Sequence, residues 1–471
     1  MEGSKIEDNI LYPLNGGYYS PFDLTPFKGR HYVDHLLERV RNHVKEQGDG
    51  PWLTNGAKKV TGKSKAFGDA SHSLSEAEPR ARQIASILHH KFGVVKEDVV
   101  HFVVPGNAEM YFPIIGTWLL RGVVSPADPG LSVEVLVAQM EEANTKVVFC
   151  CLATLAKMEK VRDKLGKDIA LIVMDGASDH ERSLDYLRNE DDLADRPSLP
   201  EQESTEENSF LGICWSSGTT GRPKGIMLGE NLFLKQFHQS GPAVVTTTCF
   251  FHLGGFMAPL NALGHGQELT FIAPEDLEDD IGVIMKVAAE SSANMFTCGS
   301  HHLIQLASWD MPADQKPAES IQMVCPLGTN VYEGIFNDLK DKFPAAFAVL
   351  EVYGQSEGGI AVAVGFDQKT LGGTRYFQSA ISENLDYLSN FYAISCLGQK
   401  QLRSPTLTLV CQLVQMWLAR SLTSQTTRCW ATSTTQKKMK GFSARTDSFT
   451  LETSATMMKL ATSTLMAGSK S

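Results

Sequence analysis

The segment CWSSGTTGRPKGIML, Cys214 to Leu228, decides how the chain is interpreted. It follows an apolar run and combines small hydroxyl side chains, glycines and a lysine: Ser216, Ser217, Gly218, Thr219, Thr220, Gly221 and Lys224. Glycines let the backbone approach a ligand closely, while N–H groups, hydroxyls and a lysine can donate to phosphate oxygens. The pattern is not GxxxxGK[ST], because Gly225 follows the lysine. It predicts a phosphate-binding loop, the alternative being an ordinary surface loop.

Composition limits the class of protein. The chain has 471 residues, enough for two or three domains. Its formal charge of -11 argues against nucleic acid as a partner. The nine cysteines include the adjacent Cys150 and Cys151 but no CxxC pair, so we expect neither disulfides nor a zinc site. A reducing compartment fits this cysteine usage.

The ends of the chain and its apolar stretches bear on localisation. The first residues are charged and lack the apolar core of a signal peptide. The most apolar stretch, about residues 111–124, contains Arg121 and is too short to span a bilayer, so we expect no integral membrane segment. The final Ser469-Lys470-Ser471 differs from the peroxisomal signal S-K-L. A cytoplasmic or peroxisomal location is expected.

Apolar periodicity predicts helices and strands in alternation. Helices are expected at roughly 32–47, 75–91 and 107–121, and a buried strand at 98–104. Such alternation predicts an α/β fold with layered, mainly parallel sheets, which bind ligands at the carboxyl ends of their strands. The expected divisions are a first α/β subdomain at 1–179, an acidic linker at 180–209, a second α/β subdomain at 210–366 and a tail at 367–471.

Two further motifs carry groups suited to nucleotide chemistry. FFHLGGF, residues 250–256, places His252 in an apolar run, where a lone histidine is more often a core residue. YGQSE, residues 353–357, follows a predicted strand. Its aromatic ring can stack on adenine, its hydroxyl can bond a phosphate, and its carboxylate can hold Mg²⁺. A plain turn is the alternative for YGQSE, and His301-His302 is expected to be structural.

Together the three motifs resemble the adenylate-forming superfamily: acyl-CoA synthetases, 4-coumarate–CoA ligases, firefly-type luciferases and adenylation domains. The resemblance implies that ATP activates a small carboxylic acid to an acyl-adenylate, which then reacts with CoA or, in luciferases, with oxygen. It implies ATP, Mg²⁺ and CoA as cofactors. Lys224 would contact phosphates, His252 would border the acyl group, and Glu357 would hold the metal. The nucleotide-binding residues would be those of the phosphate loop together with Tyr353, Gly354, Gln355, Ser356 and Glu357.

The chain also departs from the superfamily pattern. The segment after Leu228 reads Gly-Glu-Asn, without the usual histidine. Residues 323–327, MVCPL, stand where the superfamily carries the glycine loop SGGAPL. The acid to be activated, the choice between CoA ligase and luciferase chemistry, and the oligomeric state are therefore left open.

The resemblance stops after about Phe366. Residues 401–471 hold nine Lys/Arg, two Asp/Glu and 24 Ser/Thr, which fits a disordered polar tail. In a shifted codon frame with free wobble bases, however, residues 404–419 can encode ADLDTGVPAGPNVVGE. Later stretches can encode the superfamily's ribose motif and hinge. We therefore interpret the tail, from about Ala393, as frame-shifted, whereas residues 372–392 fit neither frame.

This interpretation has consequences for activity. Without the ribose aspartate and a C-terminal catalytic domain, we expect little or no synthetase turnover. A catalytically inactive remnant that still binds nucleotide or an acyl ligand is the alternative. A third possibility is an unstable product, because an incomplete domain leaves apolar surface uncovered.

Overall fold

The computed structural model describes residues 30–176, 181–189, 199, 209–216, 224–234, 243–327, 334–346, 348–355 and 359–367, together with three short strands. These strands are β1 (Tyr12–Leu14) and β2 (Gly17–Tyr19), which pair with each other, and β17 (Phe377–Gln378). The tail interpreted as frame-shifted, from about Ala393, lies outside the described residues.

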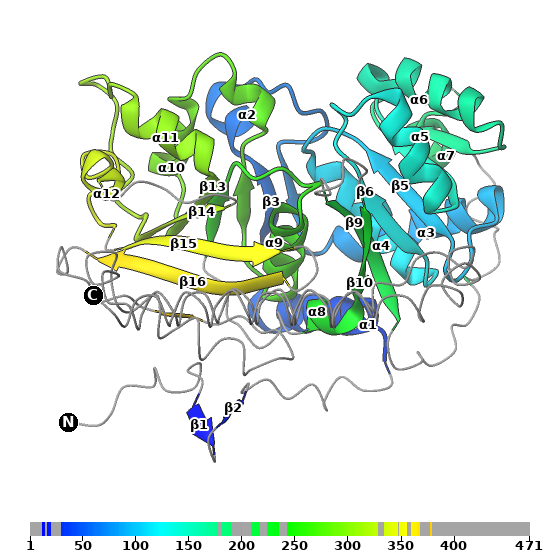
Figure 1. Ribbon diagram of the computed structural model, residues 1–471, viewed down its shortest axis with the longest axis horizontal. Helices are drawn as coiled ribbons and strands as arrows, with labels where there is room; N and C mark the ends of the chain where they lie inside the picture. The colour runs from blue at the N-terminus through cyan, green and yellow to red at the C-terminus, as the bar shows by residue number, and fades with distance from the viewer. Residues whose placement is uncertain are drawn as a thin grey trace, which may run out of the picture. The chain divides into compact units, whose positions relative to one another are not determined.

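A six-stranded sheet has the order β10-β9-β6-β5-β7-β8 (Figure 1). All neighbours are parallel except β10, which runs antiparallel to β9 at the edge. Its strands, in chain order, are β5 (Val99–Val103), β6 (Val123–Pro126), β7 (Thr145–Cys150), β8 (Ala170–Val173), β9 (Phe210–Ser216) and β10 (Lys224–Gly229). Every residue of β5 is buried, as expected of a strand covered on both faces.

A nine-stranded sheet has the order β17-β16-β15-β14-β13-β11-β12-β3-β4. The strands from β15 to β3 in this order are parallel, and the outer strands pair antiparallel. Its other strands are β3 (Pro51–Asn55), β4 (Ser71–Ser73), β11 (Val244–Thr246), β12 (Leu269–Phe271), β13 (Met295–Gly299), β14 (Met323–Leu327), β15 (Ala348–Gln355) and β16 (Gly359–Asp367).

Helices occupy most of the connections between parallel strands. The first half of the chain contributes α1 (Tyr32–Gln47), α2 (Gly56–Thr61), α3 (Ala77–Phe92), α4 (Tyr111–Leu119), α5 (Val133–Glu142), α6 (Leu152–Leu165) and α7 (Leu184–Asn189). The second half contributes α8 (Glu230–Leu234), α9 (Leu253–Gly264), α10 (Val283–Glu290), α11 (Ser300–Ser308) and α12 (Ile335–Asp338). Short 3₁₀ turns lie at Ala108–Met110 and Pro274–Leu277.

The predicted α/β fold with mainly parallel sheets is confirmed. The sheets do not follow the expected divisions of the chain, because each takes strands from both sides of residues 180–209. β3 and β4 join the nine-stranded sheet, and β9 and β10 join the six-stranded one. The segment expected to be a linker also contains α7, whose Leu184 and Leu187 are buried.

A shared aromatic core joins the two sheets. Trp118 of α4 donates from Nε1 to the Leu211 carbonyl of β9 over 2.7 Å, and Trp52 of β3 donates to Pro259 of α9 over 2.7 Å. The Tyr111 hydroxyl lies 3.1 Å from the carbonyls of both Gly255 and Phe256. These buried side chains fix β9 against α9, the helix that begins within the FFHLGGF motif.

A buried carboxylate ties the start of α1 to the β9–β10 pair. Glu230 accepts a hydrogen bond from the backbone N–H of Tyr32 and another from Ser209 Oγ at 2.6 Å. An anion near the first turn of a helix stabilises its unpaired N–H groups. Burial raises the pKa of Glu230 even though these bonds oppose the shift.

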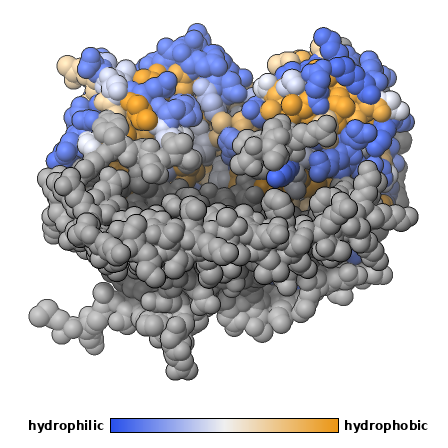
Figure 2. Space-filling model, in the orientation of Figure 1, coloured by the Kyte–Doolittle hydropathy of each residue, from blue (hydrophilic) through white to orange (hydrophobic). Residues whose placement is uncertain are grey.

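The surface is mixed in character. Figure 2 shows apolar residues in two groups on the upper half of this face, with polar residues between them. Among the described residues, the large apolar side chains that are exposed are Val95, Leu152 and Ile304, which come from separate elements. Within the described part of the chain, every helix is too short or too polar to cross a membrane.

Candidate nucleotide site

The predicted phosphate loop joins two antiparallel strands. Ser216 is the last residue of β9, Lys224 is the first of β10, and the two are paired in register. The Lys224 side chain is exposed. Ser217, Gly218, Thr219, Thr220 and Gly221 lie outside the described residues, as does the side chain of Ser216. The structure therefore places the two ends of the loop beside each other at the carboxyl end of β9.

The base of this hairpin is held by an indole. Trp215 Nε1 donates to Ser125 Oγ of β6 over 2.9 Å. A Cβ atom at Gly225, the partner of Trp215 in β10, would lie 3.2 Å from the indole ring. Glycine at this position lets the ring lie against β10.

His252 stands at the start of α9, just beyond the carboxyl end of β11. Its backbone takes the extended conformation of an N-cap residue, and its side chain is exposed. Removal of water by the surrounding protein lowers the pKa of His252, and the Asp128 carboxylate opposes this shift. Because Asp128 follows β6 of the other sheet, the interaction links the carboxyl edges of the two sheets.

A second contact supports the same arrangement. A Cβ at Gly106, in the loop after β5, would lie 3.6 Å from Cδ of Pro274, which follows β12. Burial is the main reason that the pKa of the Cys249 thiol is raised to about 11, and the negative charges of Glu275 and Asp128 add to the effect. Residues that follow strands of both sheets therefore converge, which is the place where open α/β sheets bind ligands.

The FFHLGGF motif has a structural component that the sequence did not reveal. A Cβ at Gly255 would lie 2.1 Å from the Cys249 carbonyl oxygen, so a larger residue there requires the backbone to move. At Gly254 a Cβ would lie 3.1 Å from Cδ1 of Leu327, the last residue of β14. The turn that carries His252 thus packs against the end of β14.

The YGQSE motif begins at the end of the neighbouring strand. Leu327 of β14 pairs with Val352 of β15, so Tyr353, Gly354 and Gln355 are the next residues of β15 along this edge. Their side chains lie outside the described residues, as do Ser356 and Glu357 entirely. The backbone nevertheless brings the start of this motif beside the turn that carries His252.

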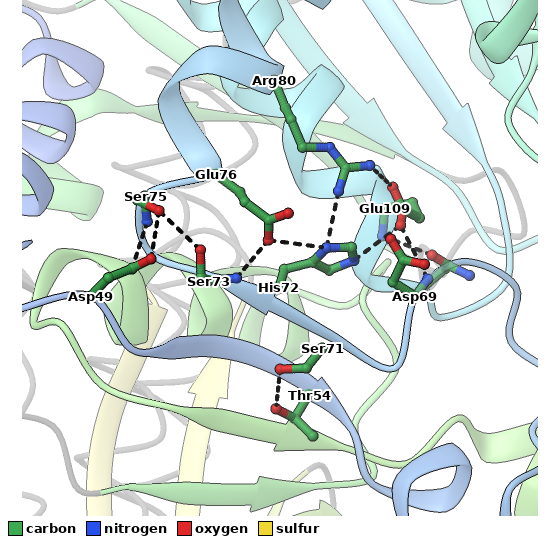
Figure 3. A network of polar contacts seen from close by, with 11 residues as sticks. Asp49, Thr54, Asp69, Ser71, His72, Ser73, Ser75, Glu76, Arg80 and Glu109 are labelled. Carbon is green, nitrogen blue, oxygen red and sulfur yellow. Dashed lines mark hydrogen bonds and ion pairs between the residues drawn. The ribbon is translucent and has the colours of Figure 1, made fainter.

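One group of histidine and carboxylates among the described residues could be suspected of binding a metal: Asp69, His72 and Glu109 (Figure 3). His72 Nε2 faces Glu109 Oε1 at 3.0 Å, and Arg80 Nη1 lies 3.0 Å from His72 Nδ1. Arginine can only donate, so His72 Nδ1 must accept, and the ring proton is on Nε2. A metal at Nε2 would require that proton to move to the nitrogen that faces Arg80.

The charges around Glu109 agree with a structural role. Burial would raise the pKa of Glu109, but the hydrogen bond from His72 and the charge of Arg80 hold it below its ordinary value. The Arg80 guanidinium also lies 3.8 Å from the ring centre of Phe112. The group is a charge-balanced network that ties β4 and α3 to the 3₁₀ turn Ala108–Met110, and these contacts indicate a structural role.

Sequence reasoning missed Trp215, Ser125, His101 and Asp128. The tryptophan was inside the quoted segment, and the histidine was inside the predicted buried strand 98–104. A histidine in a strand that is otherwise apolar was the available signal, because such a side chain needs polar partners.

Comparison with known proteins identifies the class. Residues 44–377 match the family model of the AMP-binding enzymes, which covers well over half of the chain, and the chain belongs to that family. It therefore falls in the adenylate-forming superfamily, as its three motifs predicted.

Particular relatives are distant. The chain is 23% identical over 344 residues to 4-coumarate–CoA ligase 3 of Arabidopsis thaliana, covering 69% of this chain and 56% of that protein. It is 26% identical over 187 residues to 4-coumarate–CoA ligase 2 of Nicotiana tabacum, covering 40% of this chain and 31% of that protein. The match thus spans 31% to 56% of the length of these curated relatives.

Solved structures share the fold. A luciferase-like enzyme from the mealworm Zophobas morio superposes with a TM-score of 0.59 at 20% identity, covering 73% of this chain and 76% of that one. A long-chain-fatty-acid–CoA ligase from Archaeoglobus fulgidus gives a TM-score of 0.59 at 15% identity, with 72% and 67% covered. At these identities the likeness establishes the fold alone.

Proposed function

We propose that this chain binds ATP at the β9–β10 hairpin and belongs to an enzyme that activates a small carboxylic acid as its acyl-adenylate. One observation carries the proposal. Lys224 pairs with Ser216 at the carboxyl end of β9, His252 follows β11, and Tyr353 lies near the end of β15, so three residues far apart in the sequence lie at or beyond the carboxyl ends of parallel strands. Family membership supports the same chemistry.

The roles follow from the chemistry of each group. Lys224 and the hydroxyls and N–H groups of residues 216–221 would donate to phosphate oxygens as charge develops on them. Tyr353 would stack on adenine, and Glu357 would hold Mg²⁺, which would neutralise phosphate charge when bound. His252 carries no strong partner among the described residues, and its lowered pKa favours a neutral ring beside an acyl group.

Turnover by this chain is proposed to be weak. Residues 367–471 show none of the ribose and hinge motifs that the superfamily resemblance implies. Loss of one well-aimed donor typically costs about 10² to 10³ in rate. The second candidate, a binding protein without turnover, rests on the same sequence observation, and CoA as acceptor is proposed only by analogy with the ligases in the family.

The test measures ATP binding to the full chain by equilibrium dialysis in the presence of Mg²⁺. Replacing Lys224 with alanine should weaken binding by about ten-fold or more, because a charge-assisted bond to phosphate is lost. Lys316→Ala removes an exposed lysine before the amino end of β14 in the nine-stranded sheet, and it should leave binding unchanged. Equal affinities in all three proteins, or no binding by the unmodified chain, would refute the proposal.

Pyrophosphate exchange separates the two candidates. A panel of small acids is added with ATP, Mg²⁺ and labelled pyrophosphate, and label entering ATP is counted. Weak exchange that requires an acid supports the ligase. ATP binding with no exchange for any acid supports the binding protein, whereas rapid exchange would contradict the proposed loss of turnover.

A further inference from the structure

A chain of hydrogen-bonded side chains crosses the six-stranded sheet at the level of the hairpin base. Trp215 of β9 donates to Ser125 of β6 over 2.9 Å. Ser125 Oγ lies 3.0 Å from His101 Nε2 of β5, and His101 Nδ1 lies 2.8 Å from Thr145 Oγ1 of β7. The four residues come from four adjacent strands of the sheet.

One set of proton positions satisfies both Ser125 and His101. Indole N–H only donates, so Ser125 Oγ accepts from Trp215. With its own proton directed to His101 Nε2, Ser125 is satisfied, and the imidazole then donates from Nδ1 to Thr145. This arrangement needs a neutral imidazole, and burial lowers the pKa of His101 from 6.5 to about 3. Ser125 and His101 thus each accept one hydrogen bond and donate one.

The backbone alone ties the hairpin weakly to the sheet. β10 is an edge strand that pairs with β9. β9 in turn pairs with β6 where Gly212 lies opposite Val124. Trp215 lies three residues further along β9, yet its side chain reaches Ser125, the residue after Val124. The bond from Trp215 to Ser125 therefore attaches the hairpin to β6 beyond the backbone pairing of Val124 with Gly212.

Packing around the indole restricts it further. Trp215 lies against the small apolar cluster of Val99, Val123, Ala143 and Ile213. The space that a Cβ at Gly225 would occupy is 3.2 Å from the ring. Ser216 and Lys224 flank the loop. Trp215 directly precedes Ser216, and its strand partner Gly225 directly follows Lys224, so an indole held in this way fixes the positions of both.

We propose that Trp215, Ser125 and His101 are positioning residues for nucleotide binding, which hold Ser216 and Lys224 at the spacing that the phosphate loop requires. The inference rests on the proposed function of that loop. None of the three residues is proposed to touch the nucleotide. Their effect is on the geometry of the loop ends and thus on the free energy of binding.

The test uses variants that keep packing and remove one bond. Trp215→Phe keeps an aromatic ring without the donor, and Ser125→Ala removes the acceptor. Ser183→Ala is the matched control, because Ser183 is also fully buried and donates to the Gly176 carbonyl over 2.8 Å. It follows β8, at the far edge of the same sheet.

Two readouts are measured on the full chain. In equilibrium dialysis with ATP and Mg²⁺, Trp215→Phe and Ser125→Ala should each weaken binding about five-fold, and the double variant should be no weaker than either. Ser183→Ala should bind as the unmodified chain does. Amide hydrogen exchange of residues 210–216 and 224–229 should be faster in the first two variants and unchanged in the control.

The outcomes distinguish this inference from the function on which it rests. If the unmodified chain binds no ATP, the proposed function is wrong, and hydrogen exchange of the two strands decides the inference. Unchanged exchange in Trp215→Phe and Ser125→Ala overturns it. Equal losses of affinity in all variants, including Ser183→Ala, also overturn it, because the effect would then be general destabilisation.

Discussion

The neutral, buried His101 makes the stability of the fold depend on pH in a way that can be calculated. In the unfolded chain the imidazole titrates near 6.5, whereas burial lowers its pKa to about 3 in the fold. The folded state therefore binds fewer protons below pH 6.5, and the contribution of His101 to stability, complete above that pH, is lost as pH falls toward 3. Its immediate partners, Ser125, Thr145 and Trp215, carry no charge that could offset this effect.

The magnitude follows from the two pKa values. One pKa unit corresponds to about 1.4 kcal/mol, so moving from pH 7.5 to pH 5 should cost about 2 kcal/mol of unfolding free energy through this one residue. His101→Gln does not titrate and can keep one of the two hydrogen bonds. It should be about 1 kcal/mol less stable than the unmodified chain at pH 7.5. Below about pH 6, His101→Gln should be more stable than the unmodified chain.

The assay is equilibrium urea unfolding of the full chain, followed by tryptophan fluorescence at a series of pH values. His302 also has a lowered pKa, of about 4, from burial and the neighbouring His301. The decisive quantity is therefore the difference between the two proteins at each pH. Ser183→Ala, which loses a buried bond but no titrating group, should differ from the unmodified chain by a constant amount. A constant difference for His101→Gln as well would refute the reasoning.

Two further predictions concern stability and metals. Gly255→Ala should lose about 2 kcal/mol of unfolding free energy, because its Cβ would meet the Cys249 carbonyl at 2.1 Å, while Gly254→Ala should lose less, since only the flexible end of Leu327 must move. Urea unfolding compares the two, and equal losses would contradict the packing argument. Added Zn²⁺ should not raise the melting temperature. Zinc at His72 Nε2 would require the ring proton to move to Nδ1, and Nδ1 already accepts a hydrogen bond from Arg80. A saturable rise that disappears in His72→Ala would show that the cluster binds metal after all.

Much of the fold, and the protein family, could be predicted from local sequence patterns and from the order of the motifs. The expected helix at 32–47 is α1 to the residue, and the expected strand at 98–104 contains β5, because amphipathic and fully apolar runs have distinct periods. The family followed from three motifs, since their chemistry and order are specific. The roles of individual residues in those motifs stay predictions.

The pairing of strands that are far apart in sequence could not be predicted in the same way. β3 pairs with β4, the next strand in sequence, and also with β12 from the second half of the chain, and nothing local to β3 indicates this second pairing. Likewise, the tie from Trp215 through Ser125 to His101 depends on strand order, which no short segment encodes. Gly255 in FFHLGGF was assigned to a binding motif by resemblance, while its steric requirement comes from the Cys249 carbonyl.

The most direct test of the central claim is to locate bound ATP on the chain. The full chain is irradiated with 8-azido-ATP and Mg²⁺, and the labelled peptides are identified by mass spectrometry with and without excess ATP. The account predicts label in peptides that contain residues 353–357 or 214–228, and its loss when ATP competes. Label that is confined to other segments, or that ATP does not displace, would contradict the claim that these motifs form a nucleotide site.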